Sequence, residues 1–289
     1  MVAVCYDFRP PEHINELAMI IIGNRAHFLA VGGIENSIRS LAEAAESKKI
    51  PVVLVCREPL KDEMLDASSW RLPRKVELVC YPDDSNTGLF SRLATFLRGG
   101  VTLPKIYRTL HNRDPHAVVI ARNHLHVLAA RSAGFEKIRY LVPSVVTNQL
   151  GEEAKGADIS SRFKILVRMV IDGLAQRKAL KSSIPFVFSQ CMLRQLLHEL
   201  PASCPKKIIM VKPGINCQRF RIATTQEKSG LREKLGLPQD RRVCLFVGRM
   251  VRAKGLHYLI DAMTFMPEDC ILVLVGEGSE EQHVLKKVS

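Results

Sequence analysis

An apolar run that ends in glycine and cations limits the possible folds of this chain more than any other feature. The run Val243–Val247 is followed by Gly248, and the segment Arg249–Lys254 carries three cations before a helix expected to open at Gly255. Glycine lets a ligand approach the backbone closely, and the first turn of a helix offers N–H groups to an anion. Arg and Lys add full positive charge. The segment therefore predicts a strand end that binds a diphosphate.

The order of strand, glycine-containing loop, amphipathic helix and strand occurs twice, from Leu17–Gly23 and from Val243–Val247. Near-continuous apolar strands that alternate with helices are typical of parallel sheets covered on both faces. The predicted fold class is α/β, with two doubly wound, Rossmann-like domains. The second domain is expected to be incomplete, because only two of its strands precede Ser289. Further strands are expected at residues 76–81, 117–120, 138–142, 186–189 and 207–211, and further helices at 89–96, 103–110, 125–133, 161–181 and 192–200.

Shifts in composition predict the domain boundaries. Residues 1–16 contain Pro10-Pro11 and no convincing strand, so we expect an N-terminal extension. The first domain then spans residues 17–212. The segment 213–238 is polar, carries Gly and Pro at its ends, and is the predicted linker. Residues 239–289 begin the second domain.

The chain carries a formal net charge of +13, from 42 Lys and Arg against 29 Asp and Glu. Such an excess favours anionic partners, namely phosphate-bearing substrates, acidic lipid surfaces or nucleic acid. Nucleic acid is not expected, because aromatic residues make up only 6% of the chain and no recognised reader motif is present.

The eight cysteines include no C-x-x-C pair, and no clustered Cys and His spacing indicates a zinc site. We therefore expect no metal. Five cysteines lie in or beside apolar runs, and we interpret them as small core residues in a reducing cytoplasm; they are Cys5, Cys56, Cys80, Cys244 and Cys270. No apolar run approaches the length of a membrane span, and no signal peptide is evident at the N-terminus.

The helix expected at residues 161–181 is largely basic at its polar positions. Basic amphipathic helices bind anionic membrane surfaces, and the alternative is a solvated cationic face. Its cations are Arg162, Lys164, Arg168, Arg177, Lys178 and Lys181.

Five sequence runs occur in an order that resembles one enzyme family. They are Gly32-Gly33-Ile34-Glu35, Phe186-Val187-Phe188-Ser189, Val211 to Asn216 with Arg219-Phe220, FVGRMVRAKGLHYLIDAM from Phe246, and Val273 to Gly278. Together they resemble the retaining glycosyltransferases of the glycogen-synthase-like superfamily, especially family four. The similarity covers about residues 17–289.

The resemblance implies a GT-B architecture, in which two Rossmann-like domains face each other across a cleft. The N-terminal domain then shapes the acceptor site, and the C-terminal domain holds a UDP- or GDP-sugar donor. Members transfer the sugar with retention of configuration and generally need no bound metal, so no cofactor is expected. Many act on lipid-linked or envelope glycans, so we expect a glycan or lipid-linked acceptor and a cytoplasmic enzyme that is peripheral at the inner membrane face.

The resemblance also assigns roles to residues of this chain. Arg249 and Lys254 match the family's Arg and Lys that contact the diphosphate, and we expect them to stabilise its charge as it departs. Arg252 matches a variable position and is expected to be solvated. The residues expected to bind the donor are Gly32, Gly33, Gly248, Gly276, Glu277 and Gly278, for each of which an ordinary turn is the alternative.

Two departures from the family pattern are evident. Pro143 stands where the family has a His near the sugar, so another residue replaces it or the reaction proceeds without one; His124 and His126 are the nearby candidates. No E-x₇-E element in the expected context occurs before Ser289. We therefore predict a truncated enzyme with reduced or no activity.

Other functions remain open at this point. A nucleotide-sugar epimerase or a phosphorylase can share the architecture, but no acid/base carboxylates and no lysine for a pyridoxal cofactor stand out. The alternative from another class is a non-catalytic module that binds nucleotide diphosphates or depends on a partner chain.

Overall fold

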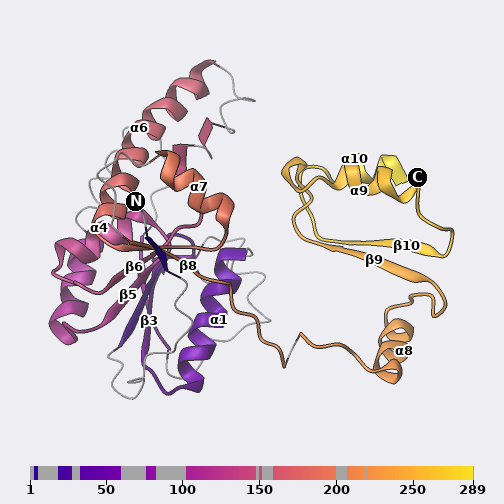
Figure 1. The fold of residues 1–289 in the computed structure, drawn as a ribbon, viewed down its shortest axis with the longest axis horizontal. Helices are drawn as coiled ribbons and strands as arrows, with labels where there is room; N and C mark the ends of the chain where they lie inside the picture. The colour runs from indigo at the N-terminus through magenta and orange to yellow at the C-terminus, as the bar shows by residue number, and fades with distance from the viewer. Residues whose placement is uncertain are drawn as a thin grey trace. The chain divides into compact units, whose positions relative to one another are not determined.

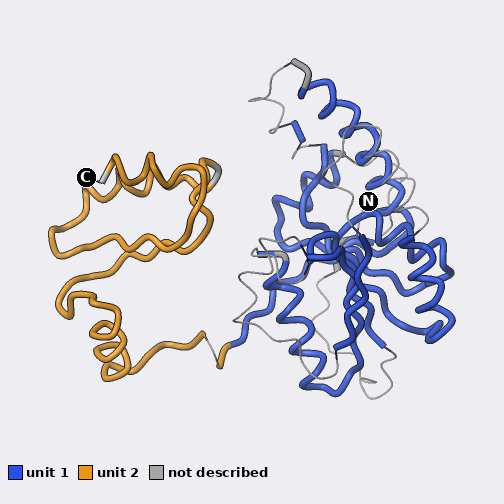
Figure 2. The backbone as a smooth tube through the Cα atoms, turned by 180° about the vertical axis from the view of Figure 1, so that it is seen from behind, with its two compact units in different colours: residues 1–216 blue, residues 217–289 orange. Residues whose placement is uncertain are grey.

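The computed structural model describes residues 3–5, 19–27, 33–59, 76–82, 102–147, 150–151, 159–199, 207–218 and 220–288. The chain divides into two compact units, Met1–Asn216 and Cys217–Ser289 (Figure 2). The division lies inside the segment 213–238, which the sequence predicted to be a linker.

Unit 1 is built on a parallel sheet whose eight strands lie in the order β1-β8-β7-β6-β5-β2-β3-β4. Every pairing between neighbouring strands is parallel. The strands are β1 (Ala3–Cys5), β2 (Ile20–Gly23), β3 (Val52–Arg57), β4 (Val76–Tyr81), β5 (Val118–Ala121), β6 (Ile138–Leu141), β7 (Ile184–Val187) and β8 (Lys207–Met210).

The strand order makes this sheet doubly wound. From β2 the chain builds outward through β3 to β4, and it then returns to β5 on the other side of β2. Helices α1 (Gly33–Ser47) and α4 (His124–Ser132) consequently lie on opposite sides of the sheet (Figure 1). Further helices of this unit are residues 102–113, α6 (Ile159–Lys181) and α7 (Gln190–Glu199). A doubly wound sheet binds ligands at the carboxyl ends of its strands where the order reverses, which here is between β2 and β5.

Alternate residues of the central strands supply two separate cores. Ile21 and Val53 belong to the cluster on the face covered by α4 and residues 102–113. Ile22 and Leu54 belong to the cluster that includes Ile38 of α1. Because both faces are covered, all six positions of β3 are buried. This explains why the strands read as continuous apolar runs; each buried aliphatic side chain contributes about 1.5–3 kcal/mol.

Unit 2 has a sheet of two parallel strands, β9 (Arg242–Val247) and β10 (Cys270–Val275). Its helices are α8 (Thr225–Lys234), the 3₁₀ turn η3 (Arg252–Lys254), α9 (Leu256–Met263) and α10 (Glu281–Val288). Its core is small and comprises Met250, Leu256, Ile260 and Val284. The predicted α/β class with parallel sheets is confirmed in both units.

Two of the predicted boundaries need correction. Residues 1–16 were expected to be an extension, but Ala3–Cys5 forms an edge strand that pairs with β8. The predicted linker 213–238 contains helix α8, because Thr224 and Glu227 form a reciprocal capping box that starts a helix locally.

Smaller differences concern single elements. The strand expected at 186–189 lies two residues earlier, because the chain bends at Phe188 and Ser189 before α7. Helix α9 ends at Met263, whereas the sequence pattern predicts a helix from Leu256 to Met266. The helix expected at 89–96 lies outside the described residues. None of the described helices combines the length and apolar composition that crossing a bilayer requires.

Candidate functional site

The loops that follow β9 and β10 lie side by side at the carboxyl end of the small sheet. The amide of Gly248 donates to the carbonyl of Val275 at 3.0 Å, and the amide of Met250 donates to the carbonyl of Glu277 at 2.7 Å. The amide of Glu280 in turn donates to the carbonyl of Met250 at 2.9 Å. The structure therefore brings the predicted residues Gly248 and Glu277 into one loop pair.

Backbone packing requires two glycines of this loop pair. Gly276 has φ +144°, and a Cβ atom added there would lie 2.0 Å from the carbonyl oxygen of Gly248. Gly278 has φ +155°, and its Cβ would lie 2.4 Å from the carbonyl oxygen of Met250. Glycine at these positions is thus explained by contact between the loops, independently of any ligand. That Gly276 and Gly278 bind the donor stays a prediction.

Arg249 and Lys254 are exposed, and neither side chain has a hydrogen-bond or ion-pair partner among the described residues. Lys254 ends η3, and Gly255 then turns the chain into α9 with a left-handed φ of 68°. Both cations are therefore carried by one loop at the strand end, as the sequence predicted.

Unit 2 also has a surface hollow, and it does not include these two cations. It has a volume of about 470 Å³ and is lined by Arg252, His257, Glu280, His283 and Lys287. Neither Arg249 nor Lys254 lines it. Arg252 is exposed at its rim, and the sequence expectation of a solvated side chain agrees with that position.

The glycine pair of the first loop is only partly described. Gly32 lies outside the described residues. Gly33 begins α1, is exposed, and a Cβ added there would meet nothing within 4 Å. Packing therefore does not require glycine at position 33.

Unit 1 contains a pocket of about 390 Å³ that the sequence analysis did not predict as a whole. It lies at the carboxyl ends of β2, β5 and β6, where the strand order reverses. The residues that line it are Arg25, Arg122, Asn123, His124, Tyr140, Pro143, Ser144, Val146, Leu150, Arg168, Asp172 and Gln176. Arg25, Arg122 and Pro143 follow the ends of parallel strands, and that position is a signal in the sequence. No such signal marks Arg168, Asp172 and Gln176, which lie on α6.

Arg122 is the most unusual residue of this pocket. It is only 4% exposed, and its Nε and Nη1 have no hydrogen-bond partner within the described parts of the chain. Its guanidinium lies over the ring of Phe188, 5.3 Å from the centroid. Burial lowers the pKa of Arg122 to about 10, and the charge of Glu35 opposes that shift. The side chain therefore stays cationic at neutral pH.

Helix α6 supplies the other charged side chains. Arg168 Nε is 3.3 Å from Asp172 Oδ2, and His124 Nε2 is 3.8 Å from Asp172 Oδ1. Burial raises the pKa of Asp172, but His124 and Arg168 outweigh burial and hold that pKa below its usual value. The carboxylate is therefore ionised and engaged.

Gln176 holds the wall of the pocket in place. Its Nε2 donates to Tyr140 Oη at 3.2 Å and to the carbonyl of Ser144 at 2.9 Å, and its Oε1 accepts from the amide of Val146 at 2.9 Å. These bonds fix the segment after β6 against α6. The pocket is therefore rigid on this side.

The two candidate histidines have different environments. His126 is fully buried, and its ring nitrogens pair with the hydroxyls of Tyr107 at 3.0 Å and Tyr81 at 3.1 Å. Burial, together with nearby His124, lowers the pKa of His126 to about 3, so it is a neutral core residue. His124 instead lines the pocket together with Pro143, and its Nε2 has no hydrogen-bond partner among the described residues.

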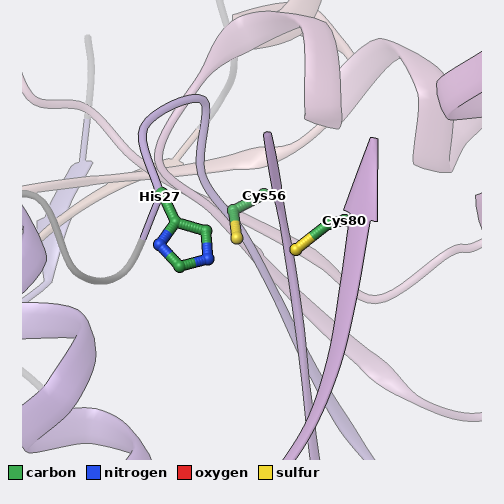
Figure 3. Close-up of side chains that lie close together, drawn as sticks. All are labelled: His27, Cys56 and Cys80. Atoms are coloured by element: carbon green, nitrogen blue, oxygen red, sulfur yellow. The ribbon is translucent and has the colours of Figure 1, made fainter. Parts of the chain in front are cut away.

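Three potential metal ligands also meet in unit 1. His27, Cys56 and Cys80 place one ligand atom each within 4.8 Å of one another (Figure 3). Cys56 and Cys80 are register partners on β3 and β4, and His27 follows β2. The three residues come from separate segments, so the sequence shows no clustered Cys and His spacing. The absence of a metal, and transfer without one, stay predictions.

Residues 227–289 match the family model of Glycosyl transferases group 1. Among curated proteins, the D-inositol 3-phosphate glycosyltransferase of Thermobispora bispora is 26% identical over 237 residues, which cover 81% of this chain and 53% of that protein. TuaC of Bacillus subtilis, a putative teichuronic acid biosynthesis glycosyltransferase, is 35% identical over 74 residues. These residues cover 26% of this chain and 19% of TuaC.

Solved glycosyltransferases share the fold. WaaG, a glycosyltransferase of lipopolysaccharide biosynthesis, superposes with a TM-score of 0.62 at 16% identity over 93% of this chain and 67% of its own. Anabaena HepE in complex with UDP and glucose superposes with a TM-score of 0.58 at 15% identity. The superposition covers 93% of this chain and 64% of HepE. The fold is that of GT-B glycosyltransferases. The chain spans about half the length of the curated relatives that it matches over most of its own length.

Proposed function

We propose that the protein is a retaining glycosyltransferase that takes its sugar from a nucleotide-diphosphate-sugar, UDP- or GDP-linked. The observation that carries the proposal is the loop pair after β9 and β10, where exposed Arg249 and Lys254 lie beside Gly248 at the strand ends. These residues fall within the segment that matches the family model. The GT-B neighbour HepE, which was solved with UDP and glucose, supports the donor class.

The chemistry gives these two cations a defined role. When the glycosyl–phosphate bond breaks, negative charge grows on the departing diphosphate. Arg249 and Lys254, together with backbone N–H groups of the loop, stabilise that charge in the transition state. Loss of one such group costs about 10²–10³ in rate in other enzymes. Retention of configuration rests on the sequence resemblance.

Nucleotide binding by the 289-residue chain tests the donor site. We expect UDP or GDP to raise the melting temperature of the chain, and the double variant R249A/K254A to lose that shift. Arg252→Ala is the matched control, because it removes a nearby exposed cation and should keep the shift. Equal stabilisation of the double variant by either nucleotide contradicts the proposal. Binding without turnover in any acceptor assay supports the alternative of a non-catalytic binding module.

We propose that transfer needs no metal, because the two cations supply the charge that a metal would otherwise provide. His27, Cys56 and Cys80 form a donor set of the kind that soft cations such as Zn²⁺ prefer. Donor hydrolysis should therefore be unchanged by EDTA and by Cys80→Ser. A loss of more than about tenfold with EDTA, restored by Zn²⁺, contradicts metal-free transfer.

We further propose that a glycan or lipid-linked acceptor is reached at the cytoplasmic membrane surface through α6. Four apolar side chains at helical spacing are exposed by 55–64%, and they are Phe163, Leu166, Val170 and Leu174. Asp172 and Gln176, which face the pocket, lie on the opposite side of the helix. Exposed cations accompany the stripe at Arg162, Lys164, Arg177, Lys178 and Lys181. An apolar stripe with cations is what an anionic lipid surface binds.

Sedimentation with vesicles tests this surface. The chain should bind vesicles that contain phosphatidylglycerol, should bind pure phosphatidylcholine weakly, and should lose binding as salt rises. Val170→Asp should abolish sedimentation, whereas Leu231→Asp, at an equally exposed leucine of α8, should not. Identical sedimentation of the two variants contradicts the assignment.

A further inference from the structure

The pocket of unit 1 has an excess of positive charge. Three guanidinium groups line it, those of Arg25, Arg122 and Arg168, and Asp172 is the carboxylate among the lining residues. That carboxylate is already engaged by Arg168 at 3.3 Å and approached by His124 at 3.8 Å. The pocket as a whole therefore attracts an anion. Every lining residue belongs to unit 1, so this property does not depend on unit 2.

Arg122 is the group in this pocket that most needs a ligand. Its Nε and Nη1 are buried without a hydrogen-bond partner among the residues that the structure describes, and a buried polar group in that state ordinarily costs about 1–3 kcal/mol. Glu35, whose charge acts on Arg122, is bonded by the side-chain amide of Asn24 at 3.3 Å. Buried arginines are nearly always paired. A ligand that brings acceptor oxygens satisfies these N–H groups.

Other groups in the pocket suit the same kind of ligand. His124 Nε2 is buried and has no hydrogen-bond partner in the part of the chain that the structure describes, and Asn123 and Ser144 add polar side chains to the lining. The ring of Phe188 and the bonds of Gln176 keep the walls in place. A volume of about 390 Å³ accommodates a phosphorylated sugar or polyol rather than a bare ion.

We propose that this pocket binds the acceptor through an anionic group, a phosphate ester, and that Arg122 and Arg168 are the residues that hold it. This inference rests on the proposed transferase function, because it names the acceptor class of that reaction. The phosphate accepts hydrogen bonds from Arg122, which fixes the hydroxyl to be glycosylated relative to the carboxyl ends of β2, β5 and β6.

Binding of small probes to the 289-residue chain tests the proposal. We expect glucose 6-phosphate and, more weakly, inorganic phosphate to bind by calorimetry, and glucose to bind at least about tenfold more weakly than glucose 6-phosphate. Arg122→Gln should weaken glucose 6-phosphate binding about tenfold or more. Arg139→Gln, at a half-buried arginine of β6 that does not line the pocket, is the matched control and should bind as the natural chain does.

Two further binding measurements distinguish the proposed acceptor pocket from the proposed donor site. UDP affinity should be unchanged in Arg122→Gln, and glucose 6-phosphate affinity should be unchanged in R249A/K254A. If UDP does not bind, the proposed donor site is contradicted, whereas the binding of glucose 6-phosphate to the pocket of unit 1 is tested separately. Absence of glucose 6-phosphate binding, its full displacement by UDP, or equal affinity in Arg122→Gln overturns the acceptor assignment. If Arg122→Gln does not fold, Arg168→Gln carries the test, because that side chain is 40% exposed.

Discussion

The cationic groups of the two units stand in opposite environments. Arg249 and Lys254 of unit 2 are exposed on a loop, whereas Arg122 of unit 1 is 4% exposed with unpaired N–H groups. An exposed cation costs folding almost nothing, so its presence alone says little about function. A buried, unpaired guanidinium lowers stability, and it is therefore the stronger indication of a ligand. The motif predicts the first site, and burial indicates the second.

The units differ again in what their glycines do. Gly276 and Gly278 of unit 2 allow two loops to touch, and Gly23 of unit 1 lies against Tyr107 and His126, whereas Gly33 meets nothing. Glycines in the same kind of sequence context thus have unlike roles. Four substitutions or titrations sharpen these contrasts.

The largest effect is expected at Gly276. Alanine there places a Cβ at 2.0 Å from a carbonyl oxygen and keeps an unfavourable φ, which should destabilise unit 2 by about 3 kcal/mol. Amide hydrogen exchange of β9 and β10 measures the loss. Gly230→Ala, on α8 with open space around it, is the control and should stabilise by about 1 kcal/mol. Unchanged exchange in Gly276→Ala means that the loops separate easily.

The next effect belongs to His126 of unit 1. Its folded pKa of about 3 lies below its unfolded value of 6.5, so the unfolded chain gains a proton first as pH falls. Stability should therefore be complete above pH 6.5 and decline by about 1.4 kcal/mol per pH unit below it. Urea unfolding between pH 7.5 and 5 measures the slope. His126→Gln should flatten the slope, and His116→Gln, at an exposed histidine, should not.

A smaller effect of opposite sign is expected at Arg122. Replacement by methionine removes buried N–H groups that lack hydrogen-bond partners among the described residues and keeps most of the volume, so unit 1 should gain about 1–2 kcal/mol while glucose 6-phosphate binding is lost. Chemical denaturation and calorimetry on the same sample report both changes. A clear loss of stability would falsify the view that Arg122 is retained for binding.

The smallest effect is expected at Arg249. The side chain is exposed and has no partner among the described residues, so alanine should change the stability of unit 2 by less than about 0.5 kcal/mol. Nucleotide binding should nevertheless fall. A destabilisation of about 2 kcal/mol or more indicates a structural role and removes the contrast with Arg122.

Much of the fold was predictable because periodicity is a local signal. The expected strand at Val76–Tyr81 has the bounds that the structure gives β4, and the helix expected at 161–181 begins only two residues earlier in α6. The errors occur where local signals are weak. Three residues at the N-terminus form a strand only by pairing with β8, and a capping box starts a helix inside a polar linker.

The sequence by itself determined the α/β class, the two-unit organisation with its similarity to glycosyltransferases, and the cations at the end of β9. Short segments of the sequence predict those features, because residue type and spacing within each segment are local signals. Only the tertiary structure decided the pocket around Arg122, the neutral state of His126 and the meeting of His27 with Cys56 and Cys80. Each joins residues from separate strands and helices, and burial, which changes their charge and bonding, arises only when the sheet has assembled.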